Sequence, residues 1–222
     1  MEQIVYRNLK KQDYNKVADL LSYAFGLHRY VSDKRLLQIF KNQYLYSCLS
    51  EATFSRVAEQ SGKVVGVIMG NAKSDYRILP HIGFALKFLL YSFKMKIYGR
   101  KISDSISGYQ ELHRIYRKFS QRHKGEFDGV LTLFAVNSEC RGKGIGKKLL
   151  FEVEAYWKEH QTKSIYLYTD TTCNYGFYEH QGFVRLEEEN LVLKSDAKPF
   201  EMGVFLYGYA INQNNNAGDQ YV

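Results

Sequence analysis

A glycine-rich stretch at residues 134–150, FAVNSECRGKGIGKKLL, constrains this chain more than any other part of it. An apolar run ends there, a short polar loop follows, and an amphipathic helical pattern begins among three glycines at alternate positions, Gly142, Gly144 and Gly146. Glycine has no Cβ, so ligand atoms can come close to its backbone. The first N–H groups of a helix lack partners within it and carry the positive end of its dipole. A strand, a glycine loop and a helix in this order therefore predict an anion site, most naturally for a phosphate.

Two common nucleotide motifs do not fit this stretch. A Walker A loop requires a glycine at the position of Arg141 and a hydroxyl residue at that of Lys148. The dinucleotide fingerprint requires a glycine where Lys147 stands. The pattern that remains is Arg-x-x-Gly-x-Gly, formed by Arg141, Gly144 and Gly146, and it resembles the pyrophosphate loop of the GCN5-related N-acetyltransferases (GNAT). In that family the loop binds acetyl-coenzyme A.

A second stretch, TDTTCNYGFYEHQGF at residues 169–183, resembles the other signature of the same family. In that signature an asparagine precedes a short helix bearing Phe-Tyr-Glu, followed by Gly-Phe; here these residues are Asn174, Phe177, Tyr178, Glu179, Gly182 and Phe183. The resemblance covers most of residues 4–210. It implies an α/β (α+β) fold with a mixed, mostly antiparallel twisted sheet of about seven strands, flanked by helices. The fourth and fifth strands are expected to be parallel and to splay apart at a bulge.

The resemblance also implies roles for individual residues. Splayed strands leave backbone groups without partners, and the amide-rich pantetheine arm can supply them; the groups concerned are those of Phe134, Ala135 and Val136. Asn174 would hydrogen-bond the cofactor, or cap the short helix that follows it. The pyrophosphate would lie on the loop residues Arg141, Gly142, Lys143, Gly144, Ile145, Gly146 and Lys147.

The chemistry implied by the resemblance is direct transfer of an acetyl group from acetyl-CoA to a primary amine of a small molecule or peptide. Tyr178 is the candidate for protonating the departing thiolate, because an ordinary tyrosine pKa near 10 keeps its proton on at neutral pH; the alternative is that its ring packs against the sheet. The general base stays open between Glu126, Asp128 and a water molecule. Other open alternatives are another acyl-CoA donor, a hydroxyl acceptor, and a non-catalytic acyl-CoA sensor.

Periodicity gives the order of the elements. Strands are predicted at residues 3–9, 54–59, 63–72, 127–136, 164–169, 184–194 and 202–209, and helices start near Asp13, near an N-cap at Ser32, and at Ile145. Gly66 and Gly70 within the third strand predict the close approach of another backbone, or a twist. One acetyltransferase domain is expected over residues 1–210, with a polar and disordered tail at 211–222.

Residues 74–126 are too long for a structureless connection between the third and fourth strands. Apolar residues at helical spacing within 81–98 and 104–123 predict a helical hairpin inserted at this point. The net charge of the chain is +8, and residues 73–125 hold 12 Lys or Arg against 3 Asp or Glu, so the basic character is local. This distribution argues against nucleic acid as a partner.

Three uses of the basic insert stay open. We expect it to shape the acceptor side of the site, ahead of forming a homodimer interface or resting on an anionic membrane; stable insertion into a membrane is not expected. A basic lining would favour an acceptor that carries an acidic group. The three cysteines lack paired spacing and predict reduced thiols, the histidines lack ligand spacing, so no metal is expected, and residues 1–9 do not resemble a secretion signal, so a cytoplasmic location is expected.

Overall fold

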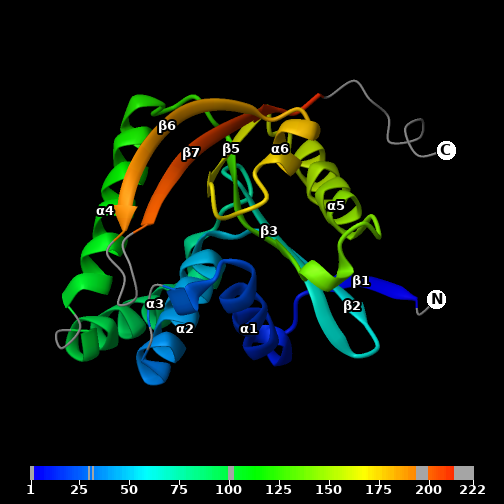
Figure 1. The fold of residues 1–222 in the computed structure, drawn as a ribbon. Coiled ribbons are helices and arrows are strands. Elements are labelled where there is room, and N and C mark those ends of the chain that lie inside the picture. Colours follow the sequence, from blue (N-terminus) through cyan, green and yellow to red (C-terminus); the bar gives the residue numbers. More distant parts are fainter. Residues whose placement is uncertain (1–2, 30, 32, 100–102, 194–199, 213–222) are drawn as a thin grey trace.

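The computed structural model describes residues 3–29, 31, 33–99, 103–193 and 200–212. In this part of the chain seven strands form one sheet in the order β1-β2-β3-β4-β5-β7-β6 (Figure 1). Every neighbouring pair is antiparallel except β4 and β5, which are parallel, as predicted. The strands are β1 (Ile4–Asn8), β2 (Phe54–Gln60), β3 (Lys63–Ala72), β4 (Gly129–Val136), β5 (Ser164–Asp170), β6 (Val184–Leu193) and β7 (Phe200–Ala210).

Helices cover both faces of this sheet. One face packs against α5, and the other packs against α1 and α2, so that two separate apolar clusters form around the same central strands. The helices are α1 (Tyr14–Ala24), α2 (Lys34–Glu51), α3 (Ile78–Gly99), α4 (Ser103–Arg122), α5 (Ile145–Glu159) and α6 (Gly176–His180), with short 3-10 turns η1 (Lys11–Asp13), η2 (Leu27–Arg29) and η3 (Ser138–Cys140).

The two glycines of β3 let α5 lie unusually close to the sheet. A Cβ added at Gly66 would meet Leu149 Cδ1 at 3.0 Å, and one added at Gly70 would meet Val153 Cγ2 at 2.7 Å. The close approach at these glycines is therefore made by side chains, chiefly of α5, and not by another backbone as predicted. Because α5 follows the glycine loop directly, this packing fixes where the loop lies.

The helix α2 begins one residue later than predicted. Its N-cap is Asp33, whose Oδ1 accepts a hydrogen bond of 2.7 Å from the Leu36 backbone N–H. Ser32, the predicted cap, lies outside the described residues. A carboxylate and a hydroxyl both satisfy the free N–H groups of a first turn, so the sequence did not distinguish the two neighbours.

The insert between β3 and β4 contains two helices, as predicted, but they diverge instead of closing into a hairpin. Figure 1 shows α4 running beside β6, away from α3. The apolar residues of α4, Ile115 and Phe119, are buried on β6 and β7, whereas Phe84 and Phe88 of α3 pack with residues of α1 and α2. Each helix therefore buries its apolar residues against a different part of the domain.

Salt bridges fix α4 on β6. Lys118 pairs with Glu189 at 2.5 Å and Arg122 pairs with Glu187 at 2.9 Å. His123 contacts both Glu187 at 3.2 Å and Glu126 at 2.7 Å. Part of the basic charge of the insert is thus neutralised by acidic side chains that come about 70 positions later in the sequence.

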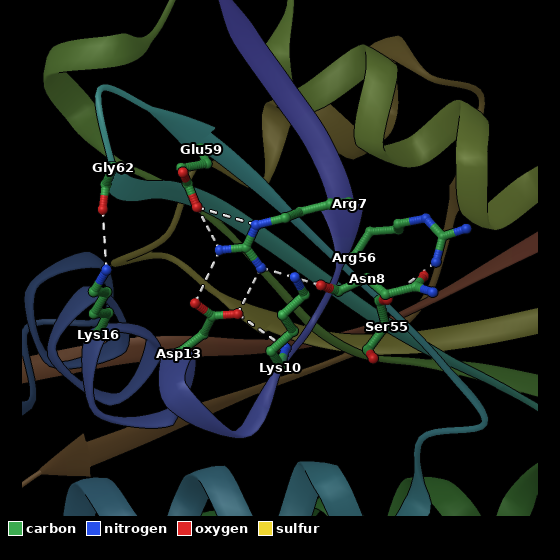
Figure 2. Close-up of polar contacts among 9 residues, drawn as sticks. All are labelled: Arg7, Asn8, Lys10, Asp13, Lys16, Ser55, Arg56, Glu59 and Gly62. Atoms are coloured by element: carbon green, nitrogen blue, oxygen red, sulfur yellow. Dashed lines mark hydrogen bonds and ion pairs between the residues drawn. The ribbon is translucent and has the colours of Figure 1, made fainter.

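A partly buried ion-pair cluster ties β1 to β2 and to the start of α1 (Figure 2). Arg7 donates to both carboxylate oxygens of Asp13 at 2.7 and 2.9 Å, and its Nε donates to Glu59 at 3.0 Å. Asp13 is fully buried and also accepts a bond of 2.9 Å from the Lys10 backbone N–H. These bonds hold the pKa of Asp13 below its ordinary value, the hydrogen bond from Arg7 being the largest cause.

Candidate active site

The site begins where β4 and β5 separate. The two parallel strands pair only at Gly129 with Ile165 and at Val130 with Tyr166. On its other side β4 carries a bulge, because Met69 of β3 pairs with Leu133 and Gly70 pairs with Leu131, which leaves Thr132 as an extra residue. Beyond this point the facing backbone groups of β4 and β5 do not bond to each other, so a ligand can bond to them.

A cavity of about 570 Å³ occupies this opening. Its lining joins the splayed halves of β4 and β5 to the glycine loop, the first residues of α5 and the α6 region. Of the residues predicted to bind the cofactor or to protonate the thiolate, Lys143 alone does not line it; those that do are Phe134, Ala135, Val136, Arg141, Gly142, Gly144, Ile145, Gly146, Lys147, Asn174 and Tyr178. The fold thus brings two stretches of the sequence, residues 134–147 and 174–178, to one cavity.

The glycine loop has the conformation that its residues predict. Gly142 and Gly144 adopt φ of 77° and 74°, in the left-handed region that glycine enters without strain. Gly144 is the N-cap of α5, so the first N–H groups of that helix follow it directly. A Cβ added at Gly146 would meet the Phe134 ring at 3.3 Å and the Phe177 ring at 3.4 Å, so this glycine allows two aromatic rings to pack on the loop.

This end of the cavity suits a phosphate ester. Helix N–H groups carry positive partial charge, and the lining adds the cationic side chains Arg141 and Lys147. Two glycines without any neighbour within 4 Å of an added Cβ, Gly142 and Gly144, leave open space beside the backbone. The residues present therefore fit the pyrophosphate of a coenzyme A ester.

Tyr178 lies on α6 inside an aromatic cluster. Its ring centroid is 5.5 Å from that of Phe183, 5.8 Å from that of Phe177 and 6.2 Å from that of Phe134. Its hydroxyl makes no hydrogen bond to any residue in the described part of the chain. Burial raises its pKa well above the ordinary value, and the nearby Cys173 and Asp170 raise it further, so the hydroxyl keeps its proton. The Tyr178 ring is therefore packed against its neighbours, as the alternative role proposed, yet the residue also lines the cavity.

Asn174 lines the cavity but does not cap α6. The N-cap position of this short helix belongs to Tyr175. Within the described residues, the backbone carbonyl of Asn174 accepts a hydrogen bond of 3.2 Å from the Phe177 N–H. The capping alternative is therefore wrong, because the helix starts one residue later, and the side-chain amide is left for a ligand.

The two acidic candidates for a general base lie outside the cavity lining. Both precede β4, at the end where β4 and β5 still pair. Glu126 contacts His123 at 2.7 Å, and Asp128 accepts a hydrogen bond of 3.1 Å from the Lys163 backbone N–H. The sequence could not show that the cavity opens farther along β4 than these two residues.

Sequence reasoning missed one acidic residue that does line the cavity, Asp170. It is the last residue of β5, and its Oδ1 accepts hydrogen bonds from the Thr172 N–H at 2.7 Å and from the Thr172 hydroxyl at 2.5 Å. A carboxylate at the end of a strand that faces the predicted opening was the available signal. Burial, and after it the charge of Asp170, raise the pKa of the neighbouring Cys173 thiol to about 12, so this cysteine stays a thiol; all three cysteines are free, as predicted.

A second part of the lining is apolar and aromatic. In Figure 1, α4 and α5 lie on opposite sides of the molecule, so the residues of α4 lie away from the glycine loop. The insert does reach the cavity, as expected, through α4; however, its lining residues Gly108, Leu112 and Tyr116 are not basic. The expected basic lining is therefore wrong for the described residues. The apolar lining here consists of Phe25, Leu27, Phe40, Tyr44, Leu112, Tyr116 and Tyr168.

Solved structures of known proteins resemble this one over nearly the whole chain. A protein from Pyrococcus horikoshii OT3, PH1933, has 19% identity and a TM-score of 0.59, with 95% of this chain and 99% of that one covered. An N-acetyltransferase from Staphylococcus aureus Mu50 has 14% identity and a TM-score of 0.54, covering 95% and 99%. Drosophila melanogaster polyamine N-acetyltransferase, which forms N-acetylagmatine, has 13% identity and a TM-score of 0.54, covering 94% and 100%.

At these identities the structural matches establish the fold. Sequence comparison with curated proteins finds no match. The family model for the acetyltransferase (GNAT) family, in contrast, matches residues 21–183, which include both the glycine loop and the α6 segment. This chain therefore belongs to the GNAT family of acetyltransferases, which uses acetyl-CoA, and it is an acyltransferase enzyme.

Proposed function

We propose that this protein transfers an acetyl group from acetyl-CoA directly to the primary amine of a small molecule or peptide, with Tyr178 as the general acid. The main observation in support of this proposal concerns the Tyr178 hydroxyl. It has no hydrogen-bond partner among the described residues, and Tyr178 lines the same cavity as the glycine loop and the splayed strands. An unpartnered, protonated donor in a ligand cavity is suited to giving its proton to a leaving group.

The geometry of the cavity supports the cofactor-binding residues that the sequence suggested. The loop from Arg141 to Lys147 would hold the pyrophosphate through backbone N–H groups and two cationic side chains, and the backbone from Phe134 to Val136 would bond the pantetheine amides. The side chain of Asn174 would add one hydrogen bond. When bound, acetyl-CoA supplies an activated acetyl thioester beside these residues.

Tyr178 would act on the departing sulfur. Its raised pKa keeps the hydroxyl protonated through the range in which an enzyme of this kind works, so the proton is present when the thiolate leaves. Cys173, the other proton-bearing group nearby, is a thiol of high pKa and is not suited to be an acyl carrier, because the thiolate is the nucleophilic form. This supports direct transfer rather than an acyl-cysteine route.

The acceptor would carry its amine on an apolar or aromatic body. The described lining contributed by α1, η2, α2 and α4 is apolar or aromatic, and Asp170 is the acidic residue among the described lining residues. Asp170 already accepts two hydrogen bonds from Thr172, so we assign the amine proton to water rather than to a side chain. An acceptor that carries an acidic group in addition to its amine would find no cation in this part of the described lining.

Release of free thiol from acetyl-CoA in the presence of a panel of primary amines tests the proposal. The panel pairs arylalkyl and alkyl amines with amino acids that carry an acidic side chain, and with alcohols of the same shape. Turnover should be highest with the apolar amines, and mass spectrometry should find acetylated amine in an amount equal to the thiol released. Thiol release only with alcohols, or equal rates with and without acceptor, would contradict it.

A further inference from the structure

The helix α3 carries a stripe of large apolar side chains that no described residue covers. Leu79 is 82% exposed, and Leu86, Leu89 and Phe93 are each about 60% exposed. A folded soluble domain rarely exposes an apolar surface this continuous unless the surface binds something. The stripe comprises Ile78, Leu79, Ile82, Leu86, Leu89, Leu90, Phe93 and Ile97.

The stripe is a fixed surface, because the opposite side of α3 is anchored. Tyr91 stacks on Tyr46 of α2 with ring centroids 5.6 Å apart, and Phe84 contacts Tyr14 of α1 edge-on at 6.3 Å. His81 Nε2 lies 3.0 Å from the Ala52 carbonyl oxygen. At 3.6 residues per turn, the exposed apolar residues fall on an arc of about 120° that faces away from these contacts.

The charged side chains of α3 itself have one sign. Helix α3 contains three lysines and no Asp or Glu. Lys87 and Lys94 lie on one border, where their ammonium groups sit 5.0 Å and 5.1 Å from the ring centroids of Tyr46 and Tyr91, and Lys96 lies on the other border. At the C-terminal end, exposed Arg35 of α2 stacks on Tyr98 at 4.4 Å and adds a further positive charge.

This charge pattern distinguishes two candidate occupants of the stripe, a second copy of the chain and an anionic lipid surface. A second copy of α3 packed on the stripe would bring the lysine borders of both helices together without an acidic partner on either helix, and like charges at close range disfavour that contact. An anionic lipid surface supplies the missing negative charge along both borders. Aliphatic and aromatic residues flanked by lysines are also the composition of helices that lie in a membrane interface. No helix among the described residues has the length and apolar content to cross a bilayer.

We propose that α3 docks this acetyltransferase on an anionic membrane surface, with the apolar stripe at the headgroup–acyl boundary and Lys87, Lys94 and Lys96 at the lipid phosphates. At the sequence level the membrane was the least favoured use of the insert, because basic amphipathic helices usually bury their apolar side in their own domain. Here α3 packs Phe84, Phe88 and Tyr91 against its own domain and exposes its aliphatic residues together with Phe93. The docking does not depend on the proposed general acid or on the acceptor.

Co-sedimentation with vesicles measures the partition of the protein between water and lipid. Wild-type protein should bind vesicles of phosphatidylcholine mixed with phosphatidylserine much more strongly than phosphatidylcholine alone, and raising the salt concentration should weaken binding. The double variant Lys87→Gln/Lys96→Gln should bind about 25-fold more weakly, since each basic residue near an anionic surface contributes about fivefold. Leu86→Gln/Leu89→Gln should lower partitioning at least about 10-fold, because both side chains lose their apolar contact with lipid.

Matched controls come from other surfaces of the same protein. Val184 and Val192 on β6 are exposed to a similar degree, at 62% and 58%, so Val184→Gln/Val192→Gln should leave binding unchanged. Lys63→Gln/Lys124→Gln removes the same charge as the lysine variant, elsewhere on the surface, and should change binding less than twofold. Circular dichroism and acetyl-CoA affinity verify that every variant is folded.

Three results would overturn the proposal. If wild-type protein binds neither kind of vesicle, or binds both equally, α3 does not dock on an anionic membrane surface. Equal losses in the α3 variants and their controls would show that α3 is not the docking surface. Sedimentation equilibrium showing a dimer that Leu86→Gln/Leu89→Gln dissociates would assign the stripe to a second copy of the chain.

Discussion

At the scale of single residues, the site depends on the backbone conformation that each residue adopts and on whether its side chain keeps a proton. Gly142 and Gly144 hold a left-handed backbone beside open space, and Tyr178 holds a proton without a partner among the described residues. The sequence predicted room for a ligand at the glycines and a protonated Tyr178, because the missing Cβ of glycine and the acidity of tyrosine are properties of the residue itself. Asp170 was missed, because its relevance comes from a neighbouring strand.

Tyr178→Phe should lower turnover by about 100-fold while the affinity for acetyl-CoA changes less than twofold, because the ring still packs and only the proton donor is lost. Steady-state kinetics and calorimetry measure the two quantities. Because the pKa of Tyr178 is raised, the wild-type activity should show no loss from deprotonation of this residue below about pH 10. The same turnover in both proteins would leave Tyr178 with a packing role only.

Gly144→Glu should abolish detectable binding of acetyl-CoA, because it strains a residue at φ of 74° and places bulk and negative charge in the loop. Gly62→Glu is the matched control, since Gly62 has φ of 75°, also has open space at Cβ, and lies in the β2–β3 turn. The control should lose similar stability and keep its affinity. Calorimetric titration with acetyl-CoA compares the two variants, and unchanged affinity in Gly144→Glu would refute the assignment of this loop to the pyrophosphate.

At the scale of elements, α4 is both part of the fold and part of the cavity. Ile115 and Phe119 are fully buried against β6 and β7, while Leu112 and Tyr116 line the cavity, and Tyr116 stacks on Tyr168 at 4.2 Å. Removing the whole insert would therefore expose an apolar cluster of the sheet. Substitutions within α4 test its part in acceptor binding more cleanly than a deletion does.

Leu112→Glu should raise KM for an apolar amine at least about 10-fold and change acetyl-CoA affinity less than twofold, because it puts a charge in the apolar lining away from the glycine loop. Gln110→Glu adds the same charge at an exposed position of the same helix and should change neither quantity. Kinetics with the best amine of the panel provide the comparison. If both variants behave alike, the α4 side of the cavity does not hold the acceptor.

At the scale of the whole molecule, the Arg7 cluster joins parts of the chain that are distant in sequence. Arg7 of β1 binds Asp13 at the start of α1 and Glu59 at the end of β2, so β1 and the first helix are fixed together on the sheet (Figure 2). Breaking such a pair leaves a buried charge without its partner. The stability of the entire domain should respond, rather than that of one loop.

Arg7→Met should reduce the free energy of unfolding by about 3–5 kcal/mol at neutral pH, because Asp13 stays buried and charged. Asp19→Asn, which removes an exposed partner of Lys41, should reduce it by about 0–1 kcal/mol. Urea denaturation followed by circular dichroism measures both. Equal small effects would mean that the buried cluster contributes no more than a surface pair.

The pH dependence follows from the lowered pKa of Asp13. A carboxyl group whose pKa is lower in the folded state stabilises the fold above its unfolded pKa, about 3.9, and loses that contribution as pH falls through the folded value. The difference in unfolding free energy between wild type and Asp13→Asn should therefore be constant above about pH 5 and shrink below pH 4. A difference that grows toward acid pH would contradict the sign of this linkage.

The sequence by itself determined the parts of this protein that depend on near neighbours in the chain. The glycine loop, the β2–β3 turn at Ser61 and Gly62, and the helix that follows Gly144 all arise from local backbone preferences and short-range spacing, and their positions were predicted nearly to the residue. The cavity lining at Asn174 and Tyr178 was predicted because a short signature carries both residues.

Only the tertiary structure decided which surfaces meet. Lys118 and Arg122 of α4 pair with glutamates of β6, and the residues of α4 that line the described cavity are not basic. The helix α3 shows its aliphatic side to solvent instead of closing a hairpin. Spacing along a helix shows that a side is apolar or charged, but not what it faces. What each side of a helix faces is decided by contacts between residues distant in the sequence, such as Tyr46 with Tyr91 and Lys118 with Glu189, and local sequence does not contain them.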